Sequence, residues 1–200
     1  MPIIIDIEQR SEAWYQAIAG NVGASSISKI ITSTGQRSKQ REDFLYTIAA
    51  ERITGKLDGI QPTQAMLTGI EREAEARNLF ELVTGLEVRE VGLIYKDDRR
   101  LCHCSPDGLV GDNAGLEIKC PSAKTHAKYL YDNKLPTEYF CQVQFSLYIS
   151  ERDVWHFVSY YPAMRPLIIE CRPDEKWIAK MESELEEFNE ECAKLVEVIR

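Results

Sequence analysis

Apolar side chains recur at two different spacings along the chain, and the spacing separates helical from extended segments. Steps of three and four residues are typical of one buried helix face, whereas alternation or short apolar runs indicate strands. Ser11 and Ser25 each precede a helical pattern and can cap it with a hydroxyl oxygen. Gly55 and Gly85 follow two longer patterns and can end them. We predict helices at about 11–19, 26–31, 44–53, 63–83, 123–132 and 138–149.

The extended segments lie mainly in the second half of the chain. Strand-like residues between turn signals predict strands at about 87–95, 100–104, 115–120, 154–160 and 167–171. After them, apolar residues from Trp177 to Ile199 form one stripe on an otherwise charged helix. That stripe is expected to pack on its own domain, and a subunit contact is the alternative. This order of elements predicts an α/β or α+β fold with a small mixed β-sheet flanked by helices.

Length and composition favour a single domain over residues 1–200. We divide it into a helical N-terminal part (1–86), a sheet that carries the candidate site (87–172) and a C-terminal helix (174–198). No apolar run approaches the ~18 residues of a membrane span, and the N-terminus does not resemble a secretory signal. The six cysteines form no Cys-x-x-Cys pair, which is typical of reduced core residues. We therefore expect a cytoplasmic protein without a membrane partner.

The net charge of −8 argues against a nucleic-acid partner until its distribution is considered. Residues 174–200 contain nine acidic and four basic side chains, so the rest of the chain carries a net charge of only −3. A polar loop contributes Arg37, Lys39 and Arg41 as possible DNA contacts, and a solvated loop is the alternative. A protein that encloses DNA needs a basic inner surface, while its outer surface can be acidic.

Two acidic residues and a lysine form the most informative motif in the chain. Asp107 follows a strand-like run, and the turn Gly111-Asp112-Asn113 separates it from a strand with Glu117 and Lys119. Alternation places Glu117 and Lys119 on one face of that strand, and a hairpin-like return brings Asp107 near Glu117. Carboxylates that converge on one point repel each other unless a cation lies between them, and oxygen ligands suit Mg²⁺ or Mn²⁺.

A lysine beside two such acids can orient or help deprotonate a water and offset charge on a phosphate. The motif therefore predicts metal-dependent cleavage of phosphodiesters, although Glu-x-Lys by itself also fits a solvated strand face. Glu73 lies on the helix arc that includes Ile70 and Phe80, where an acid needs a cation, so it is a candidate third carboxylate. Gln142 lies on an apolar helix and must be hydrogen-bonded, either structurally or to the catalytic lysine or a nucleophilic water.

Six segments resemble, in order and spacing, the phage lambda exonuclease family of viral recombination nucleases, which is YqaJ-like. The resemblance extends from about residue 9 to 190. The segments are Ala13-Trp14, Ala76-Arg77-Asn78-Leu79-Phe80-Glu81, Ser105-Pro106-Asp107-Gly108, Gly115-Leu116-Glu117-Ile118-Lys119-Cys120-Pro121, Gln142-Val143-Gln144-Phe145-Ser146, and Trp155-His156-Phe157 with Tyr160.

The resemblance implies a restriction-endonuclease-like fold with a PD-(D/E)xK core. It implies a 5′→3′ exodeoxyribonuclease that uses two Mg²⁺ ions, for which Mn²⁺ can substitute, and that digests one strand of linear double-stranded DNA. The resulting 3′ overhangs would serve phage-type recombination by single-strand annealing. The implied partners are DNA ends, a single-strand annealing protein and two further copies of the chain in a homotrimeric ring, encoded by a phage or prophage in a bacterial host.

The resemblance also implies roles for individual residues. Asp107 and Glu117 match metal ligands, and the main-chain carbonyl of Ile118 completes their shell. Glu73 matches a glutamate beside the second metal position. Lys119 matches the catalytic lysine and Gln142 the glutamine that supports it.

Ser25 and Ser105 correspond to the pocket that binds a 5′-terminal phosphate. The family pattern places an arginine four residues after the tryptophan, but this chain has Ile18 there. Recognition of the phosphate is therefore expected to be weaker, unless Lys29 or a base between Arg37 and Arg41 compensates. Met66 stands where the family has an apolar wedge that separates the terminal base pair, and an ordinary core residue is its alternative.

Two other functions are compatible with parts of this pattern. The first is a structure- or site-specific endonuclease of the same fold, which the extent of the resemblance disfavours. The second is a catalytically silent scaffold that binds DNA ends. A silent protein would have no reason to retain a costly carboxylate cluster, so the intact set of Asp107, Glu117 and Lys119 argues against it.

Overall fold

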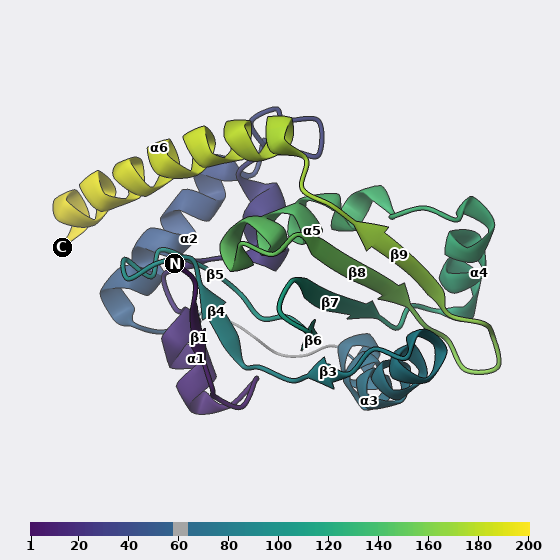
Figure 1. Ribbon diagram of the computed structural model, residues 1–200. Coiled ribbons are helices and arrows are strands. Elements are labelled where there is room, and N and C mark those ends of the chain that lie inside the picture. Colours follow the sequence, from purple (N-terminus) through teal and green to yellow (C-terminus); the bar gives the residue numbers. More distant parts are fainter. Residues whose placement is uncertain (58–63) are drawn as a thin grey trace.

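The computed structural model describes residues 1–57 and 64–200, and their side chains except those of 64–66. Its strands form two mixed sheets that lie next to each other (Figure 1). The first sheet has the order β1-β4-β5-β2, and the second has the order β3-β6-β7-β8-β9. The strands are β1 Ile3–Ile5, β2 Val22–Gly23, β3 Val88–Arg89, β4 Leu93–Tyr95, β5 Cys102–Cys104, β6 Gly108–Val110, β7 Ala114–Lys119, β8 Val154–Ser159 and β9 Leu167–Cys171.

Helices flank the strands, as the sequence predicted, although the strands form two sheets where one was expected. Local capping explains several of their ends: Ser11 accepts a hydrogen bond from the main-chain nitrogen of Trp14, and Asp174 caps the last helix through Trp177. Gly55 ends a helix in the left-handed conformation (φ 66°) that glycine tolerates best. The helices are α1 Glu12–Ile18, the 3₁₀ helix η1 Ala24–Lys29, α2 Arg41–Thr54, α3 Gln64–Thr84, α4 Ala123–Asp132, α5 Thr137–Ser150 and α6 Glu175–Ile199.

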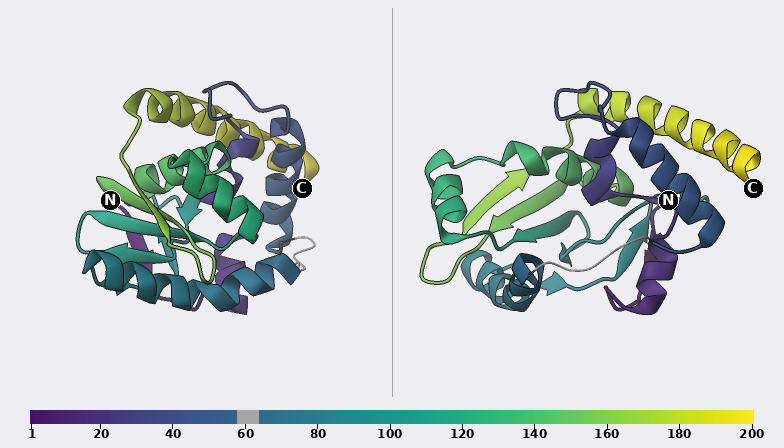
Figure 2. Two further views of the ribbon diagram at one scale, coloured as in Figure 1. Left: turned by 90° about the vertical axis from the view of Figure 1, so that its right-hand side faces the viewer. Right: turned by 180° about the vertical axis from the view of Figure 1, so that it is seen from behind.

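Helices α3 and α5 cover opposite faces of the second sheet (Figure 1; Figure 2). Ala76 and Phe80 of α3 pack in one apolar cluster with Leu116 and Ile118 of β7. The other cluster joins α5 to β8 through residues that include Phe145 and Phe157. Because side chains alternate along β7, Glu117 and Lys119 lie on the α5 face, opposite Leu116 and Ile118.

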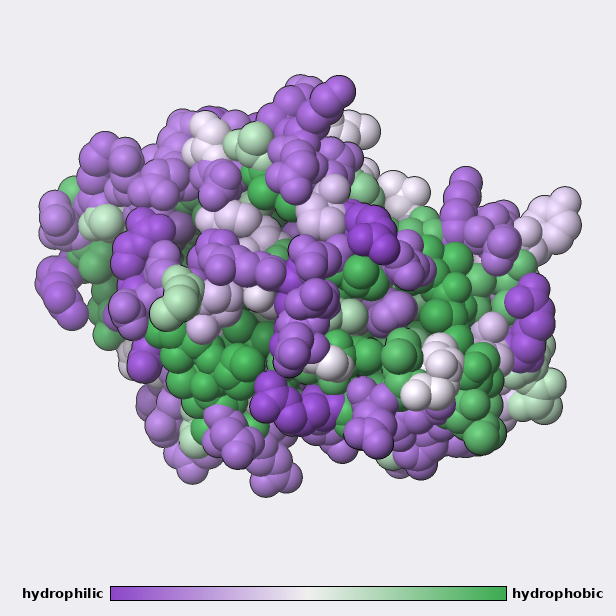
Figure 3. All heavy atoms as spheres, in the orientation of Figure 1, coloured by the Kyte–Doolittle hydropathy of each residue, from purple (hydrophilic) through white to green (hydrophobic). Residues whose placement is uncertain are grey.

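The long C-terminal helix α6 packs along α2. Its apolar stripe packs against its own domain as expected, with Trp177, Met181 and Phe188 in the core, while Ile199 at the end of the stripe is exposed. Its acidic side chains leave the surface over α6 mainly hydrophilic (Figure 3). Several of them pair with arginines of other elements: Arg37 contacts Glu184 and Glu187.

Several details differ from the sequence predictions. The strand expected at 87–95 is two strands, β3 and β4, which belong to different sheets. The partner of β7 in the hairpin is β6, a three-residue strand that was not predicted, while β5 belongs to the other sheet. The helix expected at 26–31 is the 3₁₀ helix η1, whose N-cap is Gly23 and not Ser25. The N-terminal part also contributes β1 and β2, which are too short for a clear alternating pattern.

The six cysteines are unpaired and mostly buried, as the sequence predicted. Within the described part of the chain, no helix combines the length and the apolar character needed to cross a membrane.

Candidate active site

The β6–β7 hairpin fixes Asp107 beside β7. The main-chain N–H of Asp107 donates to the carbonyl of Leu116 over 3.0 Å. In return, the main-chain N–H of Ile118 donates to Oδ2 of Asp107 over 2.6 Å. Asp107 therefore lies next to the strand that carries Glu117 and Lys119, as expected, although a shorter hairpin than predicted brings it there.

Glu117 is buried and has two partners on one oxygen. Its Oε1 accepts a hydrogen bond from Nε2 of Gln142 over 2.6 Å, and Nζ of Lys119 lies 2.5 Å from the same atom. Lys119 also lies over the ring of Tyr139, 5.3 Å from its centroid. Gln142 thus contacts the glutamate, whereas the resemblance implied that it supports the lysine.

Two ionisable groups next to Glu117, the carboxyl of Asp107 and the amine of Lys119, have strongly shifted pKa values. Burial, reinforced by the negative charges of Glu117 and Glu73, raises the pKa of Asp107 to about 8. Burial opposes the charge of Lys119, but the carboxylates of Glu117 and Asp107 outweigh it and raise the pKa of Lys119. A lysine with a raised pKa stays protonated, so it fits the stabilisation of phosphate charge better than the removal of a proton from water.

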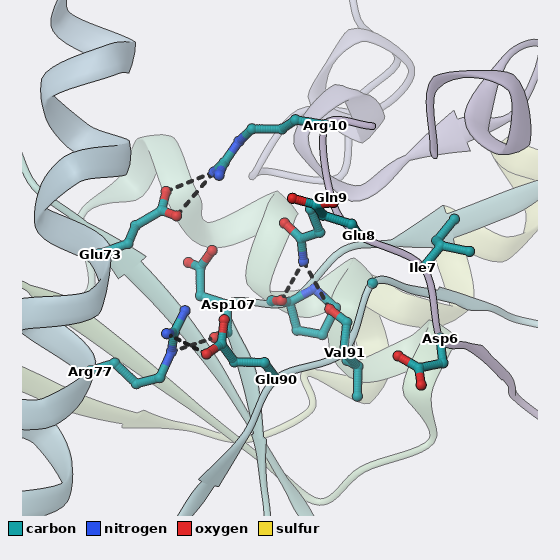
Figure 4. Close-up of a pocket in the computed structure, with 12 residues that line it drawn as sticks. Asp6, Ile7, Glu8, Gln9, Arg10, Glu73, Arg77, Glu90, Val91 and Asp107 are labelled. Atoms are coloured by element: carbon teal, nitrogen blue, oxygen red, sulfur yellow. Dashed lines mark hydrogen bonds and ion pairs between the residues drawn. The ribbon is translucent and has the colours of Figure 1, made fainter. Parts of the chain in front are cut away.

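A cleft of about 440 Å³ opens beside Asp107, between α3 and the segment that joins β1 to α1. Figure 4 shows the carboxylate of Asp107 pointing into the space between Glu73 and Arg77. Glu73, the candidate third carboxylate, reaches the cleft from α3, but Nη2 of Arg10 contacts both of its oxygens, at 2.9 and 3.0 Å. Nε of Arg77 donates to the carbonyl of Asp107 over 3.1 Å.

Three residues in this cleft were missed at the sequence level. Gln9 donates from Nε2 to the carbonyls of Val91 and Pro106, at 3.0 and 2.9 Å, and so ties the N-terminal segment to the residue before Asp107. Gln9 and Arg10 lie in an irregular segment with no periodic signal, and the position of Arg77 on its helix did not indicate a contact with Asp107. Only the three-dimensional arrangement reveals these contacts.

The two serines of the expected phosphate pocket have different surroundings. Ser105 is half-buried, and its hydroxyl accepts a hydrogen bond from Nε1 of Trp14 over 3.1 Å. Ser25 is exposed on η1. Ile18 is buried in an apolar cluster with Leu93 and Tyr95, so the residue at the family's arginine position contributes to the core.

The remaining predicted residues lie away from this cleft or outside the described residues. Arg37 pairs with α6, and Arg41, which is buried, contacts Glu191 of the same helix over 2.6 Å. Lys39 is exposed. The predicted wedge, Met66, belongs to α3, but its side chain lies outside the described part of the structure.

The carboxylates of the site offer oxygen ligands of the kind that hard divalent cations prefer. In this structure, other groups of the protein contact these oxygens. Among the described residues, no three acids, histidines or cysteines are already arranged to hold a metal ion. Asp107 is held by a main-chain N–H, Glu117 by Gln142 and Lys119, and Glu73 by Arg10. Oxygen ligands of this type suit Mg²⁺ or Mn²⁺. Burial and the neighbouring carboxylates raise the pKa of Asp107, and a bound cation would relieve both effects.

Comparison with known proteins gives a consistent picture. A family described as the YqaJ-like viral recombinase domain matches residues 13–153. Two crystal structures of LHK-Exo, an alkaline exonuclease from Laribacter hongkongensis, one of them in complex with dAMP, are 30% identical to the chain with a TM-score of 0.85. They match 94% of this chain and 96% of theirs.

A phage related exonuclease from Haemophilus somnus 129PT is 15% identical with a TM-score of 0.68, over 90% of this chain and 96% of that one. At this identity the likeness concerns the fold alone, and it agrees with the predicted mixed α/β class. No curated protein matches the chain.

Proposed function

Because the chain belongs to the YqaJ-like viral recombinase domain family, we propose that it is a Mg²⁺-dependent DNA exonuclease whose site is formed by Asp107, Glu117 and Lys119. The family agrees with the resemblance to phage lambda exonuclease found in the sequence. The LHK-Exo relatives are alkaline exonucleases, and one was solved with a mononucleotide, dAMP. A mononucleotide is the product that an exonuclease of this kind releases.

The observation that carries the proposal is the convergence of three charged groups at one end of β7. Asp107 bonds to the main chain of Ile118, and Lys119 contacts the neighbouring Glu117. This is the arrangement expected of a PD-(D/E)xK site. A partly buried cluster of acids is costly to maintain, and clusters with shifted pKa values concentrate at functional positions.

The residues present can be assigned distinct tasks in hydrolysis. Asp107, Glu117, Glu73 and the main-chain carbonyl of Ile118 would hold two divalent cations, for which Mn²⁺ can replace Mg²⁺. Bound there, the cations would supply the charge that activates water and stabilises the leaving 3′-oxygen. Lys119 would bind an oxygen of the scissile phosphate and offset its growing negative charge. Gln142 would keep Glu117 in one rotamer through the bond to Oε1.

The direction of digestion, the type of DNA end, the oligomeric state and the partner protein are proposed from the resemblance to the phage lambda exonuclease family. We expect digestion in the 5′→3′ direction from the ends of double-stranded DNA, with Ser25 and Ser105 near a 5′-terminal phosphate. A homotrimeric ring would place a basic inner surface around the DNA, and the 3′ overhangs would pass to a single-strand annealing protein. Arg37 and Arg41 are less suited to DNA contact than expected, since both pair with α6.

Incubation with Mg²⁺ and matched linear and closed circular duplexes tests the reaction class. Release of mononucleotides from linear DNA alone supports the exonuclease. Nicked or linearised circles would instead indicate an endonuclease, and the absence of products from either substrate would favour a scaffold that only binds DNA ends.

A further inference from the structure

Arg10 reaches across the cleft and forms an ion pair with Glu73. One guanidinium nitrogen, Nη2, contacts both carboxylate oxygens, at 2.9 and 3.0 Å. The two side chains come from segments 63 residues apart, the β1–α1 connection and the helix α3. Figure 4 shows the guanidinium extending over the space into which Asp107 points. The contact therefore closes one side of the cleft next to the candidate catalytic acids.

The backbone that presents Arg10 is firmly held. Arg10 has a φ of 67°, a conformation that L-residues rarely adopt. Ser11 bonds back to the carbonyl of Glu8, and Gln9 is tied to Val91 and Pro106. A Cβ on Gly92 would lie 1.9 Å from the carbonyl oxygen of Ile7, so the segment lies directly on the chain near β4. The position of Arg10 is thus built into the fold and does not depend on a loose terminus.

The charged side chains that line the cleft indicate why the Arg10–Glu73 contact matters for metal binding. Among the described residues, the cleft is lined by two arginines and five acids, namely Asp6, Glu8, Glu73, Glu90 and Asp107. Arg77 already bonds to Glu90 and to the carbonyl of Asp107. Arg10 is therefore the lining cation that faces Glu73, and it covers the same two oxygens that a metal ion would use.

We propose that Arg10 stands in for a divalent cation at Glu73 and must release this carboxylate before Glu73 can bind metal. Arg10 is then a positioning residue that lowers the affinity of the second metal position while keeping Glu73 aimed into the cleft. The inference rests on the proposed function, because it takes Glu73 as a ligand of the metal site.

The expected size of the effect is modest. Both groups are partly exposed, with side-chain exposures of 39% and 21%, and ion pairs of this kind are weak. Removing the competing guanidinium should tighten cation binding at this position roughly two- to fivefold. Added salt should narrow the difference, because it screens the Arg10–Glu73 pair.

Calorimetric titration of Mn²⁺ into the full chain without DNA tests the proposal. Arg10→Gln should bind one Mn²⁺ more tightly than the parent, and Arg10→Lys, which keeps the charge, should lie between them. Arg172→Gln is the matched control, because it removes an ion pair with Glu170 on β9, away from this cleft. The gain should disappear in the double variant Arg10→Gln/Glu73→Gln. Unchanged or weaker Mn²⁺ binding in Arg10→Gln would overturn the proposal.

The same titrations separate this inference from the proposed function. Asp107→Asn should lose the tighter Mn²⁺ site whatever Arg10 does. If Asp107→Asn binds Mn²⁺ as the parent does, the proposed metal site is wrong and the inference fails with it. If Asp107→Asn loses binding while Arg10→Gln only melts at a lower temperature without gaining affinity, the metal site stands and Arg10 is merely structural.

Discussion

Gln142 donates its side-chain amide to Oε1 of Glu117 over 2.6 Å, on the buried face of β7 covered by α5. A carboxylate that is only 3% exposed needs such partners, because an unsatisfied charged acceptor inside a protein is costly. The bond sets the orientation of Glu117 before any substrate or metal arrives. Gln142 thus acts on the acid, and it influences Lys119 only through their common partner.

Replacement of Gln142 by leucine should destabilise the protein by about 1–3 kcal/mol, because the buried Glu117 loses one of the two partners that the described residues give it. It should also lower kcat, since Glu117 is no longer held in one orientation. Urea unfolding and DNA digestion measure the two effects. Gln144→Leu is the matched control: Gln144 bonds to the main chain at Arg172 and Asp174, so its loss should cost stability without a comparable drop in kcat. Equal kcat losses in both variants would contradict the role given to Gln142.

The raised pKa of Asp107 predicts how stability depends on pH in the absence of metal. Folding raises this pKa from 3.8 to about 8, so the folded state binds a proton that the unfolded state releases between these values. Stability from this group is therefore present at low pH and is lost as pH rises from about 4 to about 8. Relative to Asp107→Asn, the parent should lose on the order of 1 kcal/mol or more between pH 5 and pH 8, measured with a chelator present. If the stability of the two proteins depended on pH in the same way, the pKa of Asp107 would not be raised as described.

Lys119→Met should separate catalysis from metal binding. Losing the charge that offsets the phosphate should reduce the rate of DNA digestion by ~10²-fold or more. The variant should still bind Mn²⁺ in a calorimetric titration, because Lys119 is not a ligand. It should unfold more easily near neutral pH, since Glu117 loses its neighbouring cation. Loss of Mn²⁺ binding would show that Lys119 has been given the wrong role.

Elements with local signals were predicted well from the sequence. The approximate span predicted for α4 matches the helix in the structure, where Ser122 caps its start and Asn133 ends it in a left-handed conformation. The triplet of β6 carries too little pattern to be recognised, and η1 differs because Gly23 takes the capping position expected of Ser25. Short segments such as these are decided by tertiary contacts.

The candidate site shows the same difference between local sequence signals and long-range contacts. Asp107, Glu117 and Lys119 could be placed together because strand alternation and one turn determine their relative positions. The contacts of Gln9 and Arg10 span 63 residues or more and have no periodic trace in the sequence. The pairing of Arg37 and Arg41 with α6 is equally non-local, so a cluster that looked suited to DNA turned out to join two helices.

Because Ile18 is buried, replacing it with the arginine of the family pattern should lower the stability of the protein. Ile18 is 8% exposed and packs with Leu93 and Tyr95, so Ile18→Arg would bury a charge among apolar side chains. The variant should lose roughly 1–3 kcal/mol of stability by urea unfolding, whereas Ile18→Leu should stay within about 1.5 kcal/mol of the parent. An Ile18→Arg variant as stable as the parent would contradict this account, because it would mean that the side chain at position 18 can reach a polar environment.

The central claim is that Asp107 and Glu117 form a metal-dependent site that removes nucleotides from the 5′ end of duplex DNA. The most direct test follows digestion of a linear duplex labelled at either the 5′ or the 3′ end of one strand, with Mg²⁺ and with the parent or Asp107→Asn. We predict immediate release of the 5′ label by the parent, delayed release of the 3′ label, and no release of either by Asp107→Asn. Early loss of the 3′ label, or parental activity in Asp107→Asn, would contradict this assignment.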